Sequence, residues 1–336
     1  MAKENDFFWK RLARFEYWPS WVFYAPFLIV WLYYAIRLRS WLYFTAVNPS
    51  MHMGGLFRYS KGEALELLPE KYLPKTRRFD ERPENAEFYK TDFDFPFICK
   101  PDFGERGKGV WLVRNEGDWK KIYSELDEPF MLQEFVEDEL EFGIFYYRIL
   151  GVNSGVFSVT AKGFLSAVGD GESTLKELIQ SNMRAVGREE YLFDRFSSEL
   201  DRVLPKGETL VLEQIGNHCR GTEFIDANHL INDQLVKVFD EITKDIKGFH
   251  YGRFDLKVRS LEDLYKGETI KVVELNGVNS EATHIYGQNF TLGKAYAVVL
   301  KQHRLAYEVA KKNLEHGFKP QPLSTFVKEL YAHLRS

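Results

Sequence analysis

Acidic and amide side chains recur on two strand-like runs in the last third of the chain. Asp255 ends the run Gly-Arg-Phe-Asp, and Glu274 and Asn276 alternate in Val-Glu-Leu-Asn. Because side chains alternate along a strand, Glu274 and Asn276 point to the same face. Two carboxylates and an amide oxygen are hard ligands that hold Mg²⁺ and leave room for water and phosphate oxygens. If the runs are neighbouring strands, they predict a magnesium site. The alternative is an ion-pair ladder with Arg253 and Lys257.

A glycine-rich loop follows another strand-like run. Lys100 precedes Gly104, Gly107 and Gly109 in the sequence KPDFGERGKGV. Such a loop lets backbone N–H groups approach phosphate oxygens, and the lysine adds a point charge. The Walker A pattern does not match this loop. It therefore indicates a phosphate-binding loop of another kind, with a simple hairpin turn as the alternative.

A third segment combines an apolar strand with an acidic turn. It contains Gln133, Glu134, Phe135 and Val136, and Glu141 follows shortly after. Its backbone can pair with an adenine edge, and a carboxylate can accept ribose hydroxyl groups. The alternative interpretation is an ordinary core strand.

These segments need a scaffold that positions them. Ser60 is the predicted cap of a helix over 60–68, and Thr174 with Glu177 forms a capping box before another helix. Residues 79–94 read as a loop. Further predicted elements are strands over 72–78, 95–101, 109–115, 130–135, 142–150, 210–213, 252–258 and 270–275, and helices over 232–247 and 292–314. Strands and helices alternate irregularly and hairpins are present, so the predicted class is α+β.

In this order and spacing the segments resemble the ATP-grasp family, in particular its D-alanine–D-alanine ligase and cyanophycin synthetase branches. The resemblance covers roughly residues 58–300. The run VGDGESTLKELI over 168–179 looks like a signature of cyanophycin-synthetase-type ligases, and GNHCRG over 216–221 takes the place of their phosphate-side segment. The resemblance implies an ATP-grasp fold in which two α+β subdomains, here 58–136 and 137–318, clamp ATP.

The resemblance also implies roles in nucleotide binding. Lys61 and Lys100 match the two phosphate-binding lysines, and the glycine-rich loop matches the flap that closes over the β- and γ-phosphates. Residues 133–136 match the hinge that receives adenine, and Glu141 matches the ribose carboxylate. These matches imply ATP as the cofactor.

For the metal and the substrates, the resemblance implies a second set of roles. Asp255, Glu274 and Asn276 match the ligands of Mg²⁺ or Mn²⁺. Arg253 matches an arginine that stabilises the transferring phosphoryl group, and Lys100 is the other predicted catalytic residue. Candidate substrate contacts are Lys162, Arg220, Asn279 and Ser280. The loop over 277–284 differs from the serine- and proline-containing loop of the D-alanine ligases, so their dipeptide specificity is not carried over.

The activity that the resemblance implies is ADP-forming carboxylate–amine ligation through an acyl phosphate. Two alternatives stay open at this point. One keeps the fold but joins the carboxylate to a thiol or transfers the phosphoryl group to a hydroxyl. The other is a nucleotide-binding membrane scaffold without turnover.

The first 57 residues differ in character from the rest. Residues 17–36 contain no charge over 20 residues, a length that would allow a membrane span, and five of the seven Trp lie in or beside them. Pro26 is expected to kink this segment, and Pro19 to open it. We therefore predict a helical segment that re-enters or lies on the cytoplasmic face of a membrane. The alternative is an aromatic helix packed on the body of the protein or in a homodimer interface.

Composition sets the remaining limits. The 336-residue chain has a net charge of −4, yet residues 1–61 hold eight Lys or Arg against three acidic residues. An acidic body argues against nucleic-acid binding, while the basic aromatic head favours an anionic membrane surface. Residues 1–57 cannot supply the Rossmann-like domain that ATP-grasp ligases carry before the core. A lipid or membrane-presented carboxylate or amine is therefore the predicted substrate, alongside small molecules. Residues 319–336 are predicted as a C-terminal helix or tail.

Overall fold

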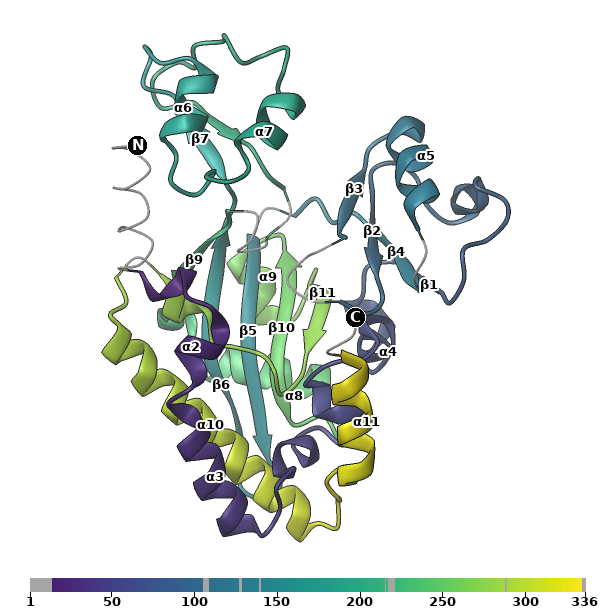
Figure 1. The fold of residues 1–336 in the computed structure, drawn as a ribbon, viewed down its shortest axis with the longest axis vertical. Helices are drawn as coiled ribbons and strands as arrows, with labels where there is room; N and C mark the ends of the chain where they lie inside the picture. Colours follow the sequence, from purple (N-terminus) through teal and green to yellow (C-terminus); the bar gives the residue numbers. More distant parts are fainter. Residues whose placement is uncertain are drawn as a thin grey trace. The chain divides into compact units, whose positions relative to one another are not determined.

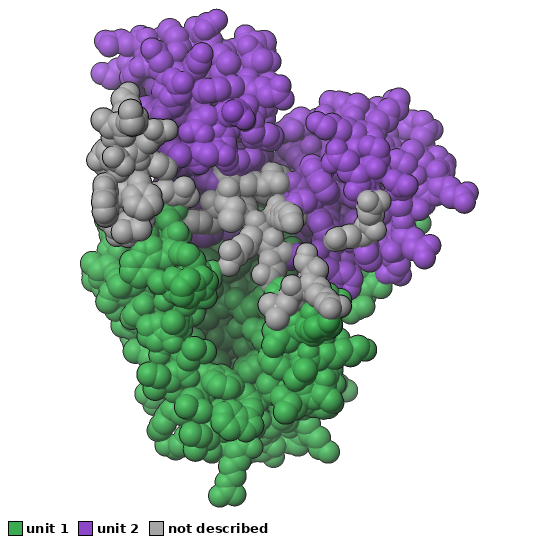
Figure 2. Space-filling view, in the orientation of Figure 1, with its two compact units in different colours: residues 1–78, 136–160, 226–336 green, residues 79–135, 161–225 purple. Residues whose placement is uncertain are grey.

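The computed structural model describes residues 14–104, 109–126, 129–138, 140–214, 216, 221–287 and 289–333. The chain divides into two compact units (Figure 2). Unit 1 comprises residues 1–78, 136–160 and 226–336, and unit 2 comprises residues 79–135 and 161–225. Both units mix helices with strands, which confirms the predicted α+β class. The domain boundaries expected at 57, 136 and 318 stay a prediction.

Unit 1 contains most of a five-stranded sheet with the order β11-β10-β5-β6-β9 (Figure 1). β10 is antiparallel to both of its neighbours, β5 and β11. The strands are β5 (Leu140–Ile149), β6 (Asn153–Gly163), β9 (Glu223–Asp226), β10 (Tyr251–Val258) and β11 (Lys271–Asn276). The described α-helices of this unit are α2 (Ser20–Tyr24), α3 (Phe27–Leu38), α4 (Lys61–Glu66), α8 (Asp233–Thr243), α9 (Leu261–Lys266), α10 (Leu292–Glu315) and α11 (Leu323–His333). Its 3₁₀ turns are η1 (Phe15–Tyr17), η2 (Tyr43–Ala46), η3 (His52–Gly55), η4 (Glu70–Tyr72), η7 (Asn228–Leu230) and η8 (Thr283–Tyr286).

The two faces of β10 meet different helices because its side chains alternate. Phe254 packs edge-on against Phe239 of α8, with ring centroids 5.1 Å apart. Tyr251 points the other way and joins the apolar cluster that α10 contributes to. Arg253 and Asp255 share the parity of Tyr251, so they lie on the α10 face of the sheet.

The aromatic segment at the start of the chain folds as two short helices. Pro19 immediately precedes α2, and Pro26 separates α2 from α3, which confirms the predicted break. One side of this pair packs on α10: Phe23 and Phe27 are buried with Val299. Within the described residues, none of the helices combines the length and the apolar character that crossing a membrane requires.

The residues that follow the aromatic helices are anchored to the sheet by Asn48. This side chain is fully buried. Its amide nitrogen donates to the carbonyls of Tyr251 (2.7 Å) and Gly54 (3.2 Å), and its oxygen accepts from the N–H groups of His250 and Tyr251. Beyond it, Gly55 has a φ of 77° and meets Gly277 so closely that a Cβ would lie 2.6 Å from the Gly277 Cα. The turn over 48–55 therefore packs directly against the end of β11.

Unit 2 contains most of a four-stranded sheet and the whole of a two-stranded one, while residues 76–78 of β1 belong to unit 1. The first has the order β1-β4-β2-β3 and packs against α5 through an aromatic core around Trp119 and Phe97. The second is the antiparallel pair β7-β8, whose strands are separated in the chain by α6 and α7. The predicted capping box of Thr174 and Glu177 begins α6. The elements are β1 (Thr76–Phe79), β2 (Phe97–Pro101), β3 (Trp111–Val113), β4 (Phe130–Glu134), β7 (Ser166–Val168), β8 (Thr209–Val211), α5 (Glu116–Glu125), α6 (Leu175–Ser181), α7 (Glu189–Arg195) and the 3₁₀ turn η5 (Phe88–Thr91).

Candidate active site

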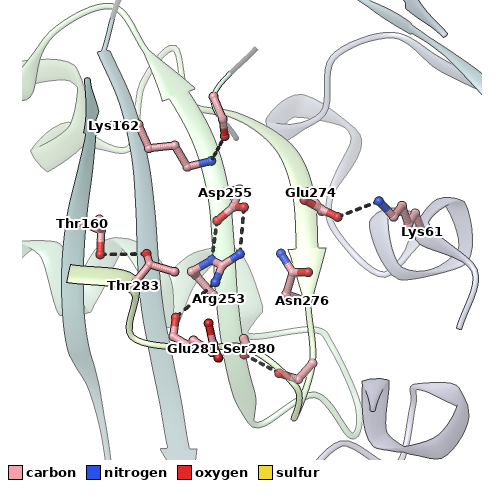
Figure 3. A network of polar contacts seen from close by, with 12 residues as sticks. Lys61, Thr160, Lys162, Arg253, Asp255, Glu274, Asn276, Ser280, Glu281 and Thr283 are labelled. Atoms are coloured by element: carbon pink, nitrogen blue, oxygen red, sulfur yellow. Dashed lines mark hydrogen bonds and ion pairs between the residues drawn. The ribbon is translucent and has the colours of Figure 1, made fainter. Parts of the chain in front are cut away.

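An acidic pair forms where β10 and β11 run side by side. Asp255 is directly opposite Glu274, and Arg253 is directly opposite Asn276. Directly opposed residues of an antiparallel pair share one face of the sheet. Figure 3 shows these four side chains together. The two runs are thus neighbouring strands, and their register brings together the three side chains predicted to bind magnesium.

Arg253 forms a bidentate ion pair with Asp255. Its Nε donates to Oδ1 at 2.6 Å and its Nη2 donates to Oδ2 at 3.1 Å. Its Nη1 donates to the backbone carbonyl of Glu281 at 3.1 Å. Burial of the guanidinium lowers its pKa, but the charge of Asp255 and these hydrogen bonds more than offset this and raise the pKa of Arg253 above its usual value. The group is therefore a fixed positive charge beside the acidic pair.

A glycine on the next strand leaves space for this ion pair. Gly143 on β5 is directly opposite Asp255. A Cβ at this position would lie 3.1 Å from Cδ of Arg253 and 3.3 Å from Oδ1 of Asp255. A larger residue would therefore force the side chains of Arg253 and Asp255 to shift by a few tenths of an ångström.

The start of α4 brings a second cation to the acidic pair. Ser60 accepts the N–H of Glu63 and begins the helix as predicted. Lys61 follows at once, and its Nζ lies 3.0 Å from Oε1 of Glu274. The hydroxyl of Tyr59 donates to Oδ1 of Asn276 at 3.2 Å. Each carboxylate of the pair thus has its own cation.

The loop after β11 adds a carboxylate that the sequence reasoning missed. Glu281 accepts a hydrogen bond from the hydroxyl of Tyr24 at 2.5 Å and another from Tyr286 at 3.1 Å. Burial and the charge of Glu281 raise the pKa of Tyr24 well above its usual value, so the phenol stays protonated. Tyr24 belongs to α2 and lies 257 positions away along the chain. No local pattern signals such a contact.

The alternative prediction for these strands is an ion-pair ladder with Arg253 and Lys257. Arg253 pairs with Asp255, and the Nζ of Lys257 donates to the carbonyls of Val136 (2.9 Å) and Asp138 (3.2 Å). Lys257 also faces Glu141 directly across β10 and β5. Glu141, the predicted ribose carboxylate, and Val136 of the predicted adenine hinge therefore both lie beside the buried Lys257.

The predicted phosphate and hinge residues of unit 2 lie on β2, on β4 and in the segments that follow them. The Nζ of Lys100 donates to Oε1 of Gln133 at 2.9 Å, and both side chains are buried. Glu134 is exposed and Phe135 is half-buried.

The described part of the glycine-rich loop has a conformation that only glycine adopts easily. Gly109 has a φ of 71°, and a Cβ there would lie 2.8 Å from the ring of Pro101. Gly104 also has a positive φ, of 150°. Gly107 lies outside the described residues.

The four candidate substrate contacts differ in their surroundings. The Nζ of Lys162 donates to the carbonyl of Gly216 at 3.1 Å, within the glycine-rich segment of unit 2. Arg220 lies outside the described residues. Oδ1 of Asn279 is buried and has no hydrogen-bond partner among the described residues. The hydroxyl of Ser280 donates to the carbonyl of Gly277, so it is engaged within its own loop.

The acidic pair fits a hard divalent cation in its donor set. Asp255 and Glu274 are opposed carboxylates, and Asn276 adds an amide oxygen on the same face. The amide nitrogen of Asn276 is buried without a hydrogen-bond partner among the described residues. In the part of the chain that the structure describes, no three His, Cys, Asp or Glu side chains gather as a metal site. The third predicted ligand is an amide, so the set would rely on water and phosphate oxygens for the remaining positions.

Known sequences that are similar to this chain test its predicted resemblance to ATP-grasp ligases. The chain is 22% identical over 266 residues to the glutathione biosynthesis bifunctional protein of Clostridium perfringens. The aligned region covers 72% of this chain and 33% of that protein. It is 24% identical over 211 residues to the cyanophycin synthetase of a Synechocystis species. This alignment covers 57% of this chain and 24% of that enzyme. The chain thus spans a third or less of these relatives. The similarity confirms the predicted resemblance to ATP-grasp carboxylate–amine ligases. No family model matches the sequence.

Solved structures give more distant similarities. The D-alanine–D-alanine ligase of Bacillus anthracis complexed with ATP shares 13% identity at a TM-score of 0.42, covering 77% of this chain and 68% of that one. The bifunctional glutathione synthetase of Pasteurella multocida shares 17% identity at a TM-score of 0.38, and the superposition covers 75% of this chain and 38% of that one.

Proposed function

Because the chain resembles ATP-grasp carboxylate–amine ligases, we propose that it is an ATP-dependent carboxylate–amine ligase that releases ADP and phosphate. The observation that carries the proposal is the opposed pair of Asp255 and Glu274, each with its own cation. A reaction that transfers a phosphoryl group needs fixed positive charge and hard oxygen ligands at one place. This arrangement supplies both.

The proposed reaction has two steps. A carboxylate oxygen of the first substrate attacks the γ-phosphorus of ATP, the bond to the bridging oxygen of the β-phosphate breaks, and ADP leaves. The acyl phosphate that forms is then attacked at its carbonyl carbon by the amine. The amine loses a proton, phosphate leaves, and an amide bond remains.

The residues of the chain act in this scheme mainly through charge and orientation. Asp255, Glu274 and Asn276 would hold Mg²⁺ or Mn²⁺, which neutralises phosphate charge when it is bound. Lys61 and Arg253 balance the carboxylates and contribute positive charge to the transferring group. Lys100 is proposed as the second phosphate-binding lysine and catalytic residue. Such groups accelerate the reaction because they are in place before the charge develops.

Further nucleotide contacts are proposed from the resemblance. Residues 133–136 receive the adenine, Glu141 accepts the ribose hydroxyl groups, and the glycine-rich loop covers the phosphates. Lys162, Arg220, Asn279 and Ser280 are proposed to contact the substrates.

The substrate class is proposed to include a lipid or membrane-presented carboxylate or amine, with the enzyme at the cytoplasmic face of a membrane. The feature that supports this is an apolar surface on α2 and α3. Small molecules of the kind that the names of the relatives indicate remain the other source of carboxylate and amine.

The decisive experiment measures ADP and phosphate release from ATP and Mg²⁺. Reactions contain either a water-soluble or a lipid extract of host cells, and the variant Glu274→Ala is compared with wild type. We expect extract-stimulated release from wild type and a loss of at least about a hundredfold in Glu274→Ala, because a metal ligand is removed. Glu262→Ala is the matched control, since Glu262 is exposed and pairs with Lys266 of its own helix. Release by Glu274→Ala at the wild-type rate would contradict the metal assignment, and product analysis would identify a thiol or hydroxyl acceptor.

A further inference from the structure

The outward side of α3 is apolar, although it faces solvent. Leu28, Ile29, Leu32, Tyr33 and Ile36 are all exposed, and Ile29 reaches 75%. These positions follow helical spacing and form one continuous stripe. Trp21 on α2 and Trp41 after α3 are also exposed. We name this set of seven side chains the outer face.

The opposite side of α3 is apolar as well, but it is covered. Phe27 and Ala35 are buried, and the ring of Tyr34 stacks on Tyr307 of α10 at 4.4 Å. Figure 1 shows α3 lying along α10. A surface helix of a globular protein normally turns a polar side to water, whereas a helix that is apolar all round is buried. The outer face therefore needs a second covering besides α10.

The charges around the outer face indicate what covers it. From Tyr17 to Gly62 the sequence contains no acidic residue, whereas Arg37 and Arg39 follow the apolar stripe directly. The Nη1 of Arg37 donates to the hydroxyl of Tyr33 at 2.9 Å, so a cation lies at the edge of the stripe. Neither arginine forms an ion pair with a carboxylate of the described residues, and such arginines favour a negatively charged partner.

The side chains themselves indicate a lipid partner. The outer face combines four aliphatic side chains with Trp21, Tyr33 and Trp41, whose rings carry a polar tip. Indole and phenol groups favour the boundary between headgroups and acyl chains. Helices that lie in the plane of a membrane combine such an apolar face with basic residues.

We infer that the outer face of α2 and α3 lies flat on an anionic lipid bilayer, while α10 covers the inner side of the same helices. The hydroxyl of Tyr24 on α2 donates to Glu281, whose backbone carbonyl accepts from Arg253, so the docked helices are linked to the loop that positions this arginine. The inference deepens the proposed function, on which it rests for the substrate but not for the docking itself.

Vesicle flotation of the full chain without ATP tests the docking. Wild type is mixed with vesicles of phosphatidylcholine alone, or of phosphatidylcholine and phosphatidylglycerol. We expect it to float with the anionic vesicles, and salt should weaken the binding because it screens the charges. Leu28→Ser with Leu32→Ser should lower vesicle affinity about tenfold for each residue. Arg37→Gln with Arg39→Gln should abolish the preference for anionic vesicles.

A second exposed apolar pair with the same spacing provides the matched control. Leu323 and Val327 of α11 are 63% and 56% exposed, comparable with Leu28 and Leu32 at 65% and 40%. Leu323→Ser with Val327→Ser should float like wild type. Equal flotation of the Leu28/Leu32 variant would overturn the inference, as would wild type that binds neither vesicle.

Two further measurements separate this inference from its rivals. A dimer in light scattering that the Leu28/Leu32 variant loses, without vesicle binding, would show that a second copy covers the outer face, and would overturn the inference. Glu274→Ala should float normally although it lacks turnover. If wild type floats but hydrolyses no ATP with any extract, the docking stands and the ligase proposal fails.

Discussion

The substitution Asn48→Ala tests whether the turn over 48–55 is held to the sheet by one side chain. Asn48 makes four hydrogen bonds to buried backbone groups of Gly54, His250 and Tyr251, and it has no exposed surface. A net contribution of about 1 kcal/mol for each bond gives a loss of about 4 kcal/mol. The carbonyl of Gly54 still accepts from the N–H of Val278 at 3.0 Å in the alanine variant. The groups of His250 and Tyr251 lose their bonds to this side chain, so a larger loss is consistent with the same reasoning.

The assay is urea unfolding followed by circular dichroism, with the free energy of unfolding obtained by linear extrapolation. Asn48→Asp is the informative second variant, because a carboxylate still accepts from the two N–H groups but donates to neither carbonyl. We expect it to be destabilised as well. Asn153→Ala, at an exposed position at the start of β6, is the control and should change stability by no more than about 0.5 kcal/mol. A loss below about 1 kcal/mol in Asn48→Ala would refute the reasoning.

Two further predictions concern Tyr24 and His250. Tyr24→Phe removes the hydroxyl that donates to the carboxylate of Glu281, and the backbone carbonyl of Glu281 accepts from Arg253. We expect the free energy of unfolding to fall by about 1.5 kcal/mol or more. We also expect a lower kcat with an unchanged KM for ATP. Unchanged unfolding and kcat would contradict this role. Burial and the nearby charge of Arg148 lower the pKa of His250 from 6.5 to about 4. Below pH 6.5 the unfolded chain therefore binds a proton that the folded chain does not. The contribution of neutral His250 to folding stability is complete above pH 6.5 and is lost as the pH falls towards 4. The thermal midpoint of wild type should fall over this range more steeply than that of His250→Gln, and parallel profiles would count against the prediction.

Several elements followed from signals within a few residues. Ser60 begins α4, Thr174 and Glu177 form the capping box of α6, and Pro26 ends one helix and precedes the next. The hairpin of β2 and β3 and the position of α10 also agree with the predictions. Such signals work because a cap, a proline or a glycine acts on the backbone of its immediate neighbours.

Other elements were missed or shifted. β1 begins at Thr76, later than the strand expected from residue 72, because residues 70–72 form a 3₁₀ turn instead. β6 and α5 were not anticipated. For α5 a usable signal existed, since Asn115 caps the helix by accepting the N–H of Asp118. For β6 the edges of the strand depend on its pairing with neighbours distant along the chain.

The sequence by itself determined which residue types stand two positions apart on β11, where α4 begins, and that an uncharged aromatic segment precedes the body. Tertiary structure alone decided that Asp255 meets Glu274, that Lys257 donates to the carbonyls of Val136 and Asp138, and that Tyr24 reaches Glu281. It also decided which side of α3 is covered. The physical reason is the distance along the chain over which each signal acts. Caps and side-chain alternation act over a few residues, whereas strand register and helix packing depend on contacts between segments that lie from about 20 to more than 250 residues apart.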